Sequence, residues 1–227
     1  MRSVVSAPGR VRPSPTGNAH SNNVGFADAE RLAPRVPAWP TIAAMPDLQP
    51  TLIGPRIIVR PITPLDWDEM FAAAADPEVW ALHPVRDRYK AEVFRDFFDG
   101  AIGSKSAFSF VDRQAGRVIG SSRYYGHDPI VREIEIGWTF LARPYWGGSY
   151  NAEVKRLMLE HAFTFVDTVV FWVGETNWRS QRAMEKIGGR RRTGLHPRTL
   201  SGATSMHVVY EILKRDFDPD GLFPQWT

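Results

Sequence analysis

The stretch "RPYWGGSYNAEVKRLMLEHAF" (residues 143–163) places two consecutive glycines between large aromatic residues and a helix-forming segment. Glycine adopts backbone conformations that other residues avoid. The first N–H groups of a helix have no partner inside the helix, and the helix dipole makes this end partly positive. The stretch therefore suits either a tight turn with Asn151 as the helix cap, or a binding site for an anionic group such as phosphate.

The segment after the glycines has the periodicity of an amphipathic helix, predicted from about Asn151 to Val166. A stripe of mostly apolar residues recurs at helical spacing and therefore lies on one face. This expected core face comprises Val154, Leu157, Met158, His161, Ala162 and Phe165. The opposite face, which we expect to meet water, carries Glu153, Arg156 and Glu160.

Strand-like and helix-like segments flank this helix on both sides. Runs of β-branched and aromatic residues between turn residues predict strands, at 56–62, 107–112, 117–125, 132–141, 168–174 and 205–213. Helical spacing and start signals, such as Thr63 followed by Pro64, predict further helices, at 63–76, 89–102 and 177–188. The "GHDP" sequence at 126–129 is expected to form a turn.

The order of these segments predicts the fold class. Strand 132–141, the helix after it and strand 168–174 form a βαβ crossover, whose two strands run parallel. The strands before this unit are joined by short turns, so we expect them to be antiparallel. We therefore predict an α/β fold with a mixed sheet and no internal repeat.

Composition excludes several classes of protein and site. No apolar run reaches the roughly 18 residues that a membrane helix needs, so we expect no membrane association. The 227 residues include no cysteine, which excludes disulfides, thiolate metal sites and a cysteine nucleophile. This absence suits the reducing cytoplasm, where we expect the protein to reside. The histidines lack the spacing of metal ligands, so no metal is expected.

Residues 1–44 differ in composition from the rest of the chain. Eight of the 18 prolines fall within the first 50 residues, mixed with Ser, Ala, Gly and Asn. We predict a disordered extension before a folded domain at 45–227, because this segment cannot bury enough apolar surface to offset its ordering entropy. A start of translation at Met45 is an alternative. Removing the five arginines and two acidic residues of the extension from totals of 28 and 25 leaves 23 of each sign. The domain is therefore neutral, and its charge gives no reason to expect nucleic acid.

Two blocks of sequence together resemble a known family. They are "EIGWTFLARPYWGGSYNAEVKRLML" (135–159) and "NWRSQRAMEKIGG" (177–189). Over about residues 51–216 the chain resembles the GNAT superfamily of acetyl-CoA-dependent N-acetyltransferases, particularly its Rim-type branch. The resemblance implies a mostly antiparallel sheet with one splayed parallel strand pair and helices on both faces. It also implies direct transfer of an acetyl group from acetyl-CoA to a protein N-terminus, a lysine or a small-molecule amine.

The resemblance implies where the cofactor binds. In the family, a loop of pattern Gln/Arg-x-x-Gly-x-Gly/Ala at the start of the third helix holds the diphosphate of CoA. Here Trp146 takes the first position, Ser149 that of the first glycine and Asn151 that of the last small residue. The implied cofactor site therefore comprises Trp146, Gly147, Gly148, Ser149, Tyr150 and Asn151, with the backbone around Thr139 and Leu141 bonded to the pantetheine arm.

The second block carries two further residues of this implied site. Asn177 would lie where the two parallel strands separate, bonded to the cofactor or to water, or would only cap the helix. Ser180 would bind near the thioester sulfur. Many relatives place a tyrosine seven residues after this asparagine to protonate the departing thiolate, but here that position is Met184, which has no proton to donate. Ser180 is therefore the predicted proton donor, as in Rim-type relatives, with an exposed helical serine as the alternative.

An amine must lose its proton before it attacks a thioester. At pH 7 this costs roughly 4.6 kcal/mol for a lysine amine of pKa near 10.4, but only about 1 kcal/mol for an N-terminal amine near 7.8. In strand 132–141, Ile134 and Ile136 alternate with Glu133 and Glu135, so one face carries carboxylates. We predict that Glu135 takes the proton through water, with Glu133 next. The alternative is that both glutamates only face solvent.

Other readings stay open at this point. A noncatalytic acyl-CoA or nucleic-acid-binding module on the same fold is the alternative function, with Arg190–Arg192 as the contact to nucleic acid. The same "GRRRTG" segment (189–194) otherwise forms a solvated strand or hairpin face. His83 lies in a loop that either covers the acceptor site or has no special role. We expect an amine acceptor as partner and a monomer or homodimer.

Overall fold

A nine-stranded mixed sheet runs through the part of the chain that the computed structural model describes, residues 45–200 and 203–219. Its strands are β1 (Leu52–Ile53), β2 (Ile57–Pro61), β3 (Ala107–Asp112), β4 (Arg117–Asp128), β5 (Glu133–Leu141), β6 (Thr168–Gly174), β7 (Arg190–Arg191), β8 (His196–Leu200) and β9 (Ala203–Leu213). The order across the sheet is β1-β2-β3-β4-β5-β6-β9-β7, and β8 also pairs with β9. All pairs are antiparallel except β5 with β6. The extension predicted for residues 1–44 lies outside the described residues.

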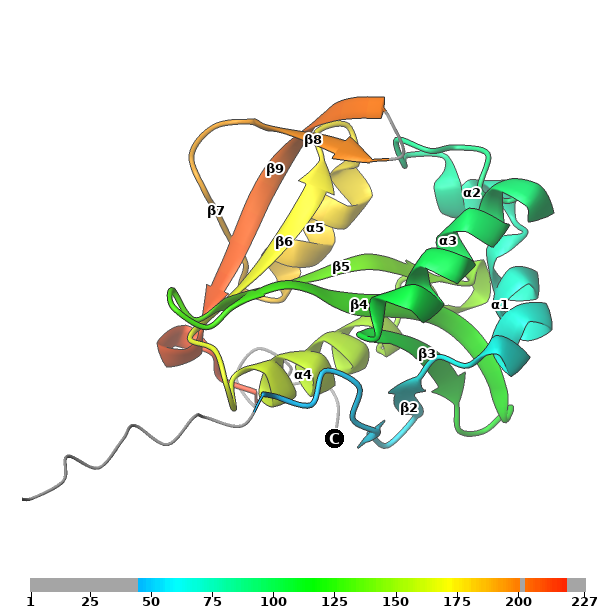
Figure 1. The fold of residues 1–227 in the computed structure, drawn as a ribbon, viewed down its shortest axis with the longest axis horizontal. Helices are drawn as coiled ribbons and strands as arrows, with labels where there is room; N and C mark the ends of the chain where they lie inside the picture. The colour runs from blue at the N-terminus through cyan, green and yellow to red at the C-terminus, as the bar shows by residue number, and fades with distance from the viewer. Residues whose placement is uncertain (1–44, 201–202, 220–227) are drawn as a thin grey trace, which may run out of the picture. The chain divides into compact units, whose positions relative to one another are not determined.

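Helices pack on both faces of this sheet (Figure 1). They are α1 (Trp67–Ala74), α2 (Pro77–Trp80), α3 (Ala91–Ser104), α4 (Tyr150–Ala162) and α5 (Trp178–Lys186), with short 3₁₀ turns η1 (Pro64–Asp66), η2 (Arg143–Tyr145) and η3 (Lys214–Asp216). Helices α1 and α3 cover one face of the sheet and α4 covers the other. The predicted fold class, with helices on both faces and one parallel strand pair, is confirmed.

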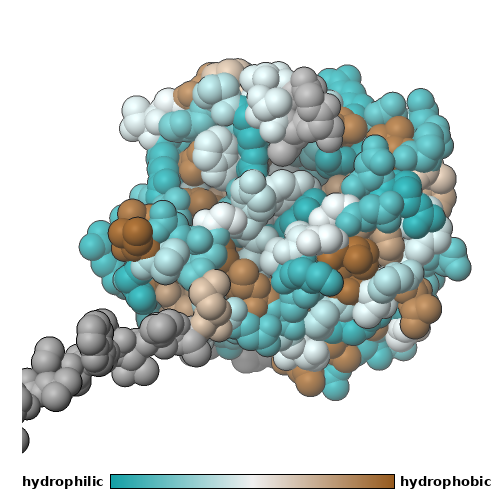
Figure 2. Space-filling view, viewed as in Figure 1, coloured by the Kyte–Doolittle hydropathy of each residue, from teal (hydrophilic) through white to brown (hydrophobic). Residues whose placement is uncertain are grey.

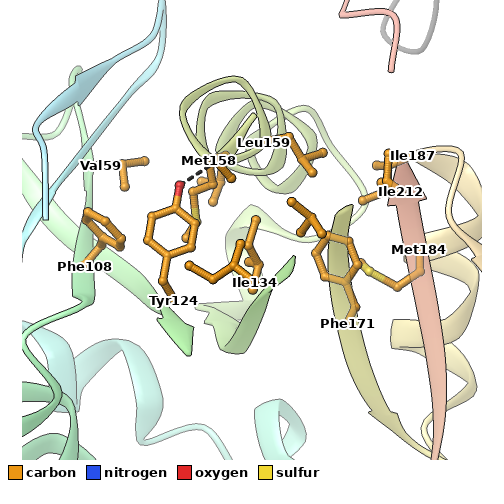
Figure 3. Packing of buried hydrophobic residues seen from close by; sticks show 14 of the residues in the cluster. Val59, Phe108, Tyr124, Ile134, Met158, Leu159, Phe171, Met184, Ile187 and Ile212 are labelled. Carbon is orange, nitrogen blue, oxygen red and sulfur yellow. Dashed lines mark hydrogen bonds between the residues drawn. The ribbon is translucent and has the colours of Figure 1, made fainter. Parts of the chain in front are cut away.

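Each face of the sheet has its own hydrophobic core. Beneath α4, the Tyr124 hydroxyl donates a 2.6 Å hydrogen bond to the Met158 carbonyl, and the ring packs beside Ile134 (Figure 3). On the α1–α3 face the core is aromatic, and Phe94 and Phe140 are fully or almost fully buried there. Two independent cores hold the sheet rigid between them, so that its central strands are buried on both sides.

The pairing of β5 with β6 stops early. Only three register pairs join them, and the last is Glu135 with Val170, although β5 continues to Leu141 and β6 to Gly174. Figure 1 shows the two strands meeting at one end and diverging at the other. Beyond the last pair, each strand stays bonded on its outer side, β5 to β4 and β6 to β9. The two inner edges therefore face a gap in the middle of the sheet.

A β-bulge accompanies this divergence. Opposite Ser121 and Arg123 of β4, the partners in β5 are Phe140 and Gly137, so β5 contains one residue more than β4. Trp138 lies within this bulge with a φ of 53°, in the left-handed region that non-glycine residues rarely adopt. A bulge bends its strand and increases the local twist. The extra residue at Trp138 thus bends β5 at the point where it leaves β6.

Most predicted segments match observed elements, with differences at their ends. The predicted turn at 126–129 is wrong for its first three residues, because β4 extends through Asp128. The predicted helix at 151–166 spans Tyr150–Ala162 in the structure, and Ser149 rather than Asn151 is its N-cap. The short elements β1, β8 and α2 were not predicted, because each has too few residues to show a period.

The water-facing assignment of Glu153 is also wrong. Its side chain is only 8% exposed, and Oε1 accepts hydrogen bonds from the backbone N–H groups of Arg56 at 2.8 Å and Ile57 at 3.2 Å. A carboxylate in the first helical turn is thereby used to hold α4 against the start of β2. Charged side chains are seldom buried unless they are bonded in this way.

Candidate functional site

The gap between β5 and β6 opens into a cavity of about 290 Å³. Its walls come from the diverging halves of both strands, the first turns of α4 and α5, the loop between α2 and α3, and β8. In the space-filling view, the surface over the middle of this face is mostly pale or teal, the colours of intermediate and hydrophilic residues (Figure 2). The cavity wall itself includes apolar rings such as Trp80 and Phe171 beside polar groups such as Glu135 and Ser180, a mixture that ligand pockets usually have.

Most residues of the predicted site line this one cavity. Those in its wall are Glu135, Thr139, Leu141, Trp146, Gly147, Asn151, Asn177 and Ser180. Gly148, Ser149 and Tyr150 belong to the same loop and helix start but are not among the lining residues. Residues from three stretches of sequence, 135–141, 146–151 and 177–180, therefore lie around one cavity, and they include both predicted catalytic residues.

The first turn of α4 has the properties of an anion site. Gly147 has a φ of 70°, which favours glycine, and a Cβ added at Gly147 or Gly148 would meet nothing within 4 Å. Ser149 is the N-cap, but its side chain makes no capping hydrogen bond. The first backbone N–H groups of α4 have no partner within the helix, and the helix dipole adds partial positive charge there. Open space and donor groups therefore coincide at this turn.

Aromatic side chains fix the loop before α4. The indole Nε1–H of Trp146 donates a 2.8 Å hydrogen bond to the carbonyl of Leu141, which ties the loop to the end of β5. The Arg179 guanidinium lies 4.1 Å from the centre of the Trp146 ring. Tyr150 packs edge-on against Tyr145, with ring centres 4.9 Å apart. The loop is thus held between β5 and α5, and a cation lies beside it.

The start of α5 forms another part of the wall. Asn177 is its N-cap, and its Oδ1 accepts a 3.1 Å hydrogen bond from the backbone N–H of Ser180. The capping role is therefore observed, and a contact with a ligand stays a prediction. Ser180 and Met184 both line the cavity, and Met184 is buried beside Phe171 (Figure 3). Of the two, only Ser180 carries a proton that it can donate.

Glu135 lies at the last register pair before the strands diverge. Its side chain is buried, and Oε1 accepts a 2.7 Å hydrogen bond from Nη1 of Arg198. Burial raises the pKa of the Glu135 carboxyl, and the charge of Arg198 opposes this rise. A Cβ at Gly137 would lie 2.6 Å from the same oxygen, which is too close. The Glu135 carboxylate can therefore take this position only because residue 137 is glycine. Glu135 also borders a second hollow, together with residues of β4, β6 and β8.

The other acidic and basic candidates lie elsewhere. Glu133 does not line the main cavity. Its carboxylate forms an ion pair with Arg192, and Arg192 also pairs with Glu211, so this arginine links β5 to β9. Arg190 forms a 3.4 Å ion pair with Asp216. Two of the three arginines proposed as a nucleic-acid contact are therefore engaged with carboxylates of the same domain.

Lys155 is a functional candidate that sequence reasoning missed. It lines the cavity from α4, is 2% exposed, and its Nζ donates a 2.7 Å hydrogen bond to the Thr139 hydroxyl of β5. Burial lowers the pKa of Lys155 to about 7, and the charge of Glu135 opposes this fall. Its spacing relative to Leu159 and Ala162 puts it on a buried face of the helix. A lysine gives no apolar signal, so the periodicity alone does not predict its burial.

A cluster of arginines was missed as well. Arg88 and Arg198 line the cavity, and Arg123 lies between them against shared aromatic rings. His83 also lines the cavity, which leaves a role in covering the acceptor site as a prediction, and burial lowers its pKa to about 3. It is therefore neutral at pH 7. Arg88 and Arg123 come from a loop and a strand without any motif, so only the structure shows that they are neighbours.

Within 45–200 and 203–219, no group of three or more His, Asp or Glu side chains could hold a metal ion. In the same ranges, no helix is long and apolar enough to span a membrane.

Among known proteins, acetyltransferases are similar to this chain in sequence and in fold. The family model described as an acetyltransferase (GNAT) domain matches residues 56–190. Among solved structures, a provisionally assigned acetyltransferase from T. thermophilus is 28% identical, with a TM-score of 0.65, covering 81% of this chain and 99% of that chain. A GCN5-related N-acetyltransferase from Brucella melitensis is 20% identical, with a TM-score of 0.66, covering 74% and 80%. RimJ from Mycobacterium smegmatis, in complex with CoA-disulfide, is 18% identical, with a TM-score of 0.57, covering 78% and 92%.

The buried amine of Lys155 gives a prediction about stability and pH. Its pKa is lowered from 10.5 to about 7 in the folded chain, so between these values the unfolded chain binds the proton more tightly. Folding stability from this group therefore rises with pH through that window. We expect the free energy of unfolding of wild type, minus that of Lys155→Met, to increase by about 3 kcal/mol between about pH 7 and about pH 9.5.

Urea titrations at both pH values measure this difference. Lys186→Met serves as the matched control, because Lys186 is exposed at the end of α5 and its removal should give a flat difference. A flat difference for Lys155→Met as well would show that the buried amine keeps an ordinary pKa.

Proposed function

The chain belongs to the GNAT acetyltransferase family, and on that basis we propose that acetyl-CoA binds along the gap between β5 and β6, where a primary amine attacks it directly. The observation that carries this proposal is the early end of the β5–β6 pairing at Glu135 and Val170. It leaves the inner edge of β5 beside a cavity that Ser180 and Glu135 also line. When bound, acetyl-CoA supplies an acetyl group activated as a thioester.

The residues present fit such a ligand in two places. The inner edge of β5 around Thr139 and Leu141 would bond the pantetheine arm as an added strand would, because this edge has no β6 partner. The first turn of α4, with Gly147 at a φ of 70° and open space in front of it, would bind the diphosphate through backbone N–H groups. Arg179 beside Trp146 would add a positive charge near that end.

Glu135 would accept the proton of the amine. It lines the main cavity together with Ser180, so an amine held there beside the thioester of acetyl-CoA would lie next to the Glu135 carboxylate. Burial raises the pKa of Glu135 and makes it a stronger base, while Arg198 keeps it ionised. Transfer through one water molecule would satisfy the geometry of general base catalysis.

Ser180 would donate a proton to the departing thiolate. It lies in the first turn of α5, where the Asn177 cap bonds its backbone N–H and so fixes the position of its backbone at the cavity wall. Met184, one turn further along, cannot serve. This chemistry needs no covalent intermediate on the enzyme.

Removal of the Ser180 hydroxyl tests its role as a proton donor. Ser180→Ala should lower kcat by about 10- to 100-fold with little change in the affinity for acetyl-CoA, because the proton is needed mainly in the transition state and water can replace it in part. The measurement is CoA thiol release under conditions where chemistry limits the rate. Ser104→Ala, in α3 and outside the cavity, is the control. An unchanged kcat in Ser180→Ala would rule out the proton-donor role.

The pH dependence of a Glu135 variant tests its role as a base. Glu135→Gln should reduce kcat/KM by about 100-fold near neutral pH, with recovery at high pH, where the amine loses its proton unaided. Recovery should be larger for a lysine-like amine than for an N-terminal amine, whose pKa values differ by about 2.6. Glu133→Gln changes a glutamate of the same strand that lies outside the main cavity, and should keep the wild-type profile. A parallel loss at every pH would point to a positional rather than a basic role for Glu135.

A further inference from the structure

Three arginines and two aromatic rings form a continuous buried row beside Glu135. The Arg88 and Arg123 guanidinium carbons lie 4.9 Å and 5.8 Å from the centre of the Phe97 ring. Those of Arg123 and Arg198 lie 4.3 Å and 4.7 Å from the centre of the Trp138 ring. Arg88 is 7% exposed and Arg123 9% exposed. The row therefore places three positive charges side by side in a region that excludes most water.

The negative charge in this region does not balance the row. Glu135 is paired with Arg198. Among the described residues, no carboxylate forms an ion pair with Arg88 or Arg123. Burial lowers the pKa of each of these two groups to about 10, so both stay protonated at pH 7. Arg123 donates a 3.0 Å hydrogen bond to the Gly100 carbonyl and lies near the charge of Glu135, whereas the hydrogen-bond contact of Arg88 is with the neutral ring of His83. A buried charge without an ionic partner is destabilising, so a negative group bound beside Arg88 would offset that cost.

The hydrogen-bond contacts of His83 also indicate that an acceptor is missing beside Arg88. Its Nδ1 lies 3.0 Å from the backbone N–H of Val85, and its Nε2 lies 3.0 Å from Nη1 of Arg88. A neutral imidazole has one nitrogen lone pair, so it can accept only one of these two donors. Either way, one N–H group of this pair faces another donor. The pair thus offers more donors than acceptors, and an oxyanion would supply the missing acceptor.

We propose that the acceptor is a small amine that also carries an anionic oxygen group, a carboxylate or a phosphate, and that Arg88 binds this group. The inference rests on the proposed acetyl transfer and names the substrate class for it. Arg88 lines the same cavity as Glu135 and Ser180, so one small molecule would place its amine by Glu135 and its anion by Arg88. Polyamines would be repelled by the same row of arginines.

Matched acceptors test the proposal at saturating acetyl-CoA. The carboxylate arm compares γ-aminobutyrate with 4-aminobutanamide, which has the same shape without the charge. The phosphate arm compares O-phosphoethanolamine with ethanolamine, and spermidine represents polycations. We expect the charged member of at least one pair to have a kcat/KM about 10- to 100-fold higher than its neutral partner. This factor corresponds to the contribution of a charge-assisted hydrogen bond to a guanidinium. The favoured arm identifies the anion.

Variants of Arg88 test its role through the preference ratio, which is the kcat/KM of the favoured anionic amine divided by that of its neutral partner. Arg88→Met should reduce that ratio to below about 3-fold, whereas Arg88→Lys should keep part of it. Arg95→Met is the control, because Arg95 also stacks on an aromatic ring, at 3.3 Å from the centre of Trp67, but lies outside the cavity. If Arg88→Met does not fold, the preference ratios of the wild type and of Arg88→Lys test the proposal instead.

Thermal shifts supply a second readout that does not depend on turnover. The favoured anionic amine should raise the Tm of the wild type with acetyl-CoA bound, and should raise that of Arg88→Met much less. The proposal is overturned if neutral amines or spermidine react as well as the anionic ones, if the ratio survives in Arg88→Met, or if no anionic amine either reacts or raises the Tm. Failure of acetyl-CoA itself to raise the Tm would instead contradict the proposed function.

Discussion

The site depends on hydrogen bonds that two neighbouring strands do not make. Strands β5 and β6 are paired only as far as Glu135 and Val170, in the middle of a sheet in which β5 stays paired with β4 to Leu141 and β6 with β9 to Gly174. Backbone N–H and C=O groups inside a protein nearly always have partners, so an unpaired interior edge is costly to maintain. The bulge at Trp138 bends β5 away from β6, and side chains of both strands are packed in the cores beside the gap. An extended ligand can complete such an edge.

Helix α4 connects this gap to the rest of the molecule. Its first turn presents unpaired N–H groups, its Glu153 carboxylate bonds to the start of β2, and its Lys155 amine bonds to Thr139 beside the gap. One helix therefore sets the position of the anion-binding turn relative to the edge of β5. Lys155 also brings a titratable amine into the space between the strands, close enough to Glu135 for their charges to interact. Stability and the charge of the site are coupled through this one residue.

The sequence predicted the parts of the fold and site that rest on local patterns. Alternation in β5, the glycines at 147 and 148 and the Asn177 cap each depend on neighbours in the chain, and the resemblance to a family connected them. The buried roles of Glu153 and Lys155 were missed because charged residues on a helix normally face water, and only their distant partners explain the exception. Arg88, Arg123 and Arg198 come from a loop and two strands, and no spacing along the chain predicts that they share two aromatic rings.

Hydrogen exchange with and without acetyl-CoA tests most directly whether the open edge of β5 is the ligand site. The account predicts that acetyl-CoA slows amide exchange in residues 138–141 and in the first turn of α4, with little change in β2 and β3, which lie away from the gap. In Gly147→Val the protection at α4 should be lost, because valine is strained at a φ of 70°. Protection that is absent from 138–141, or that appears only on strands away from the gap, would contradict the account.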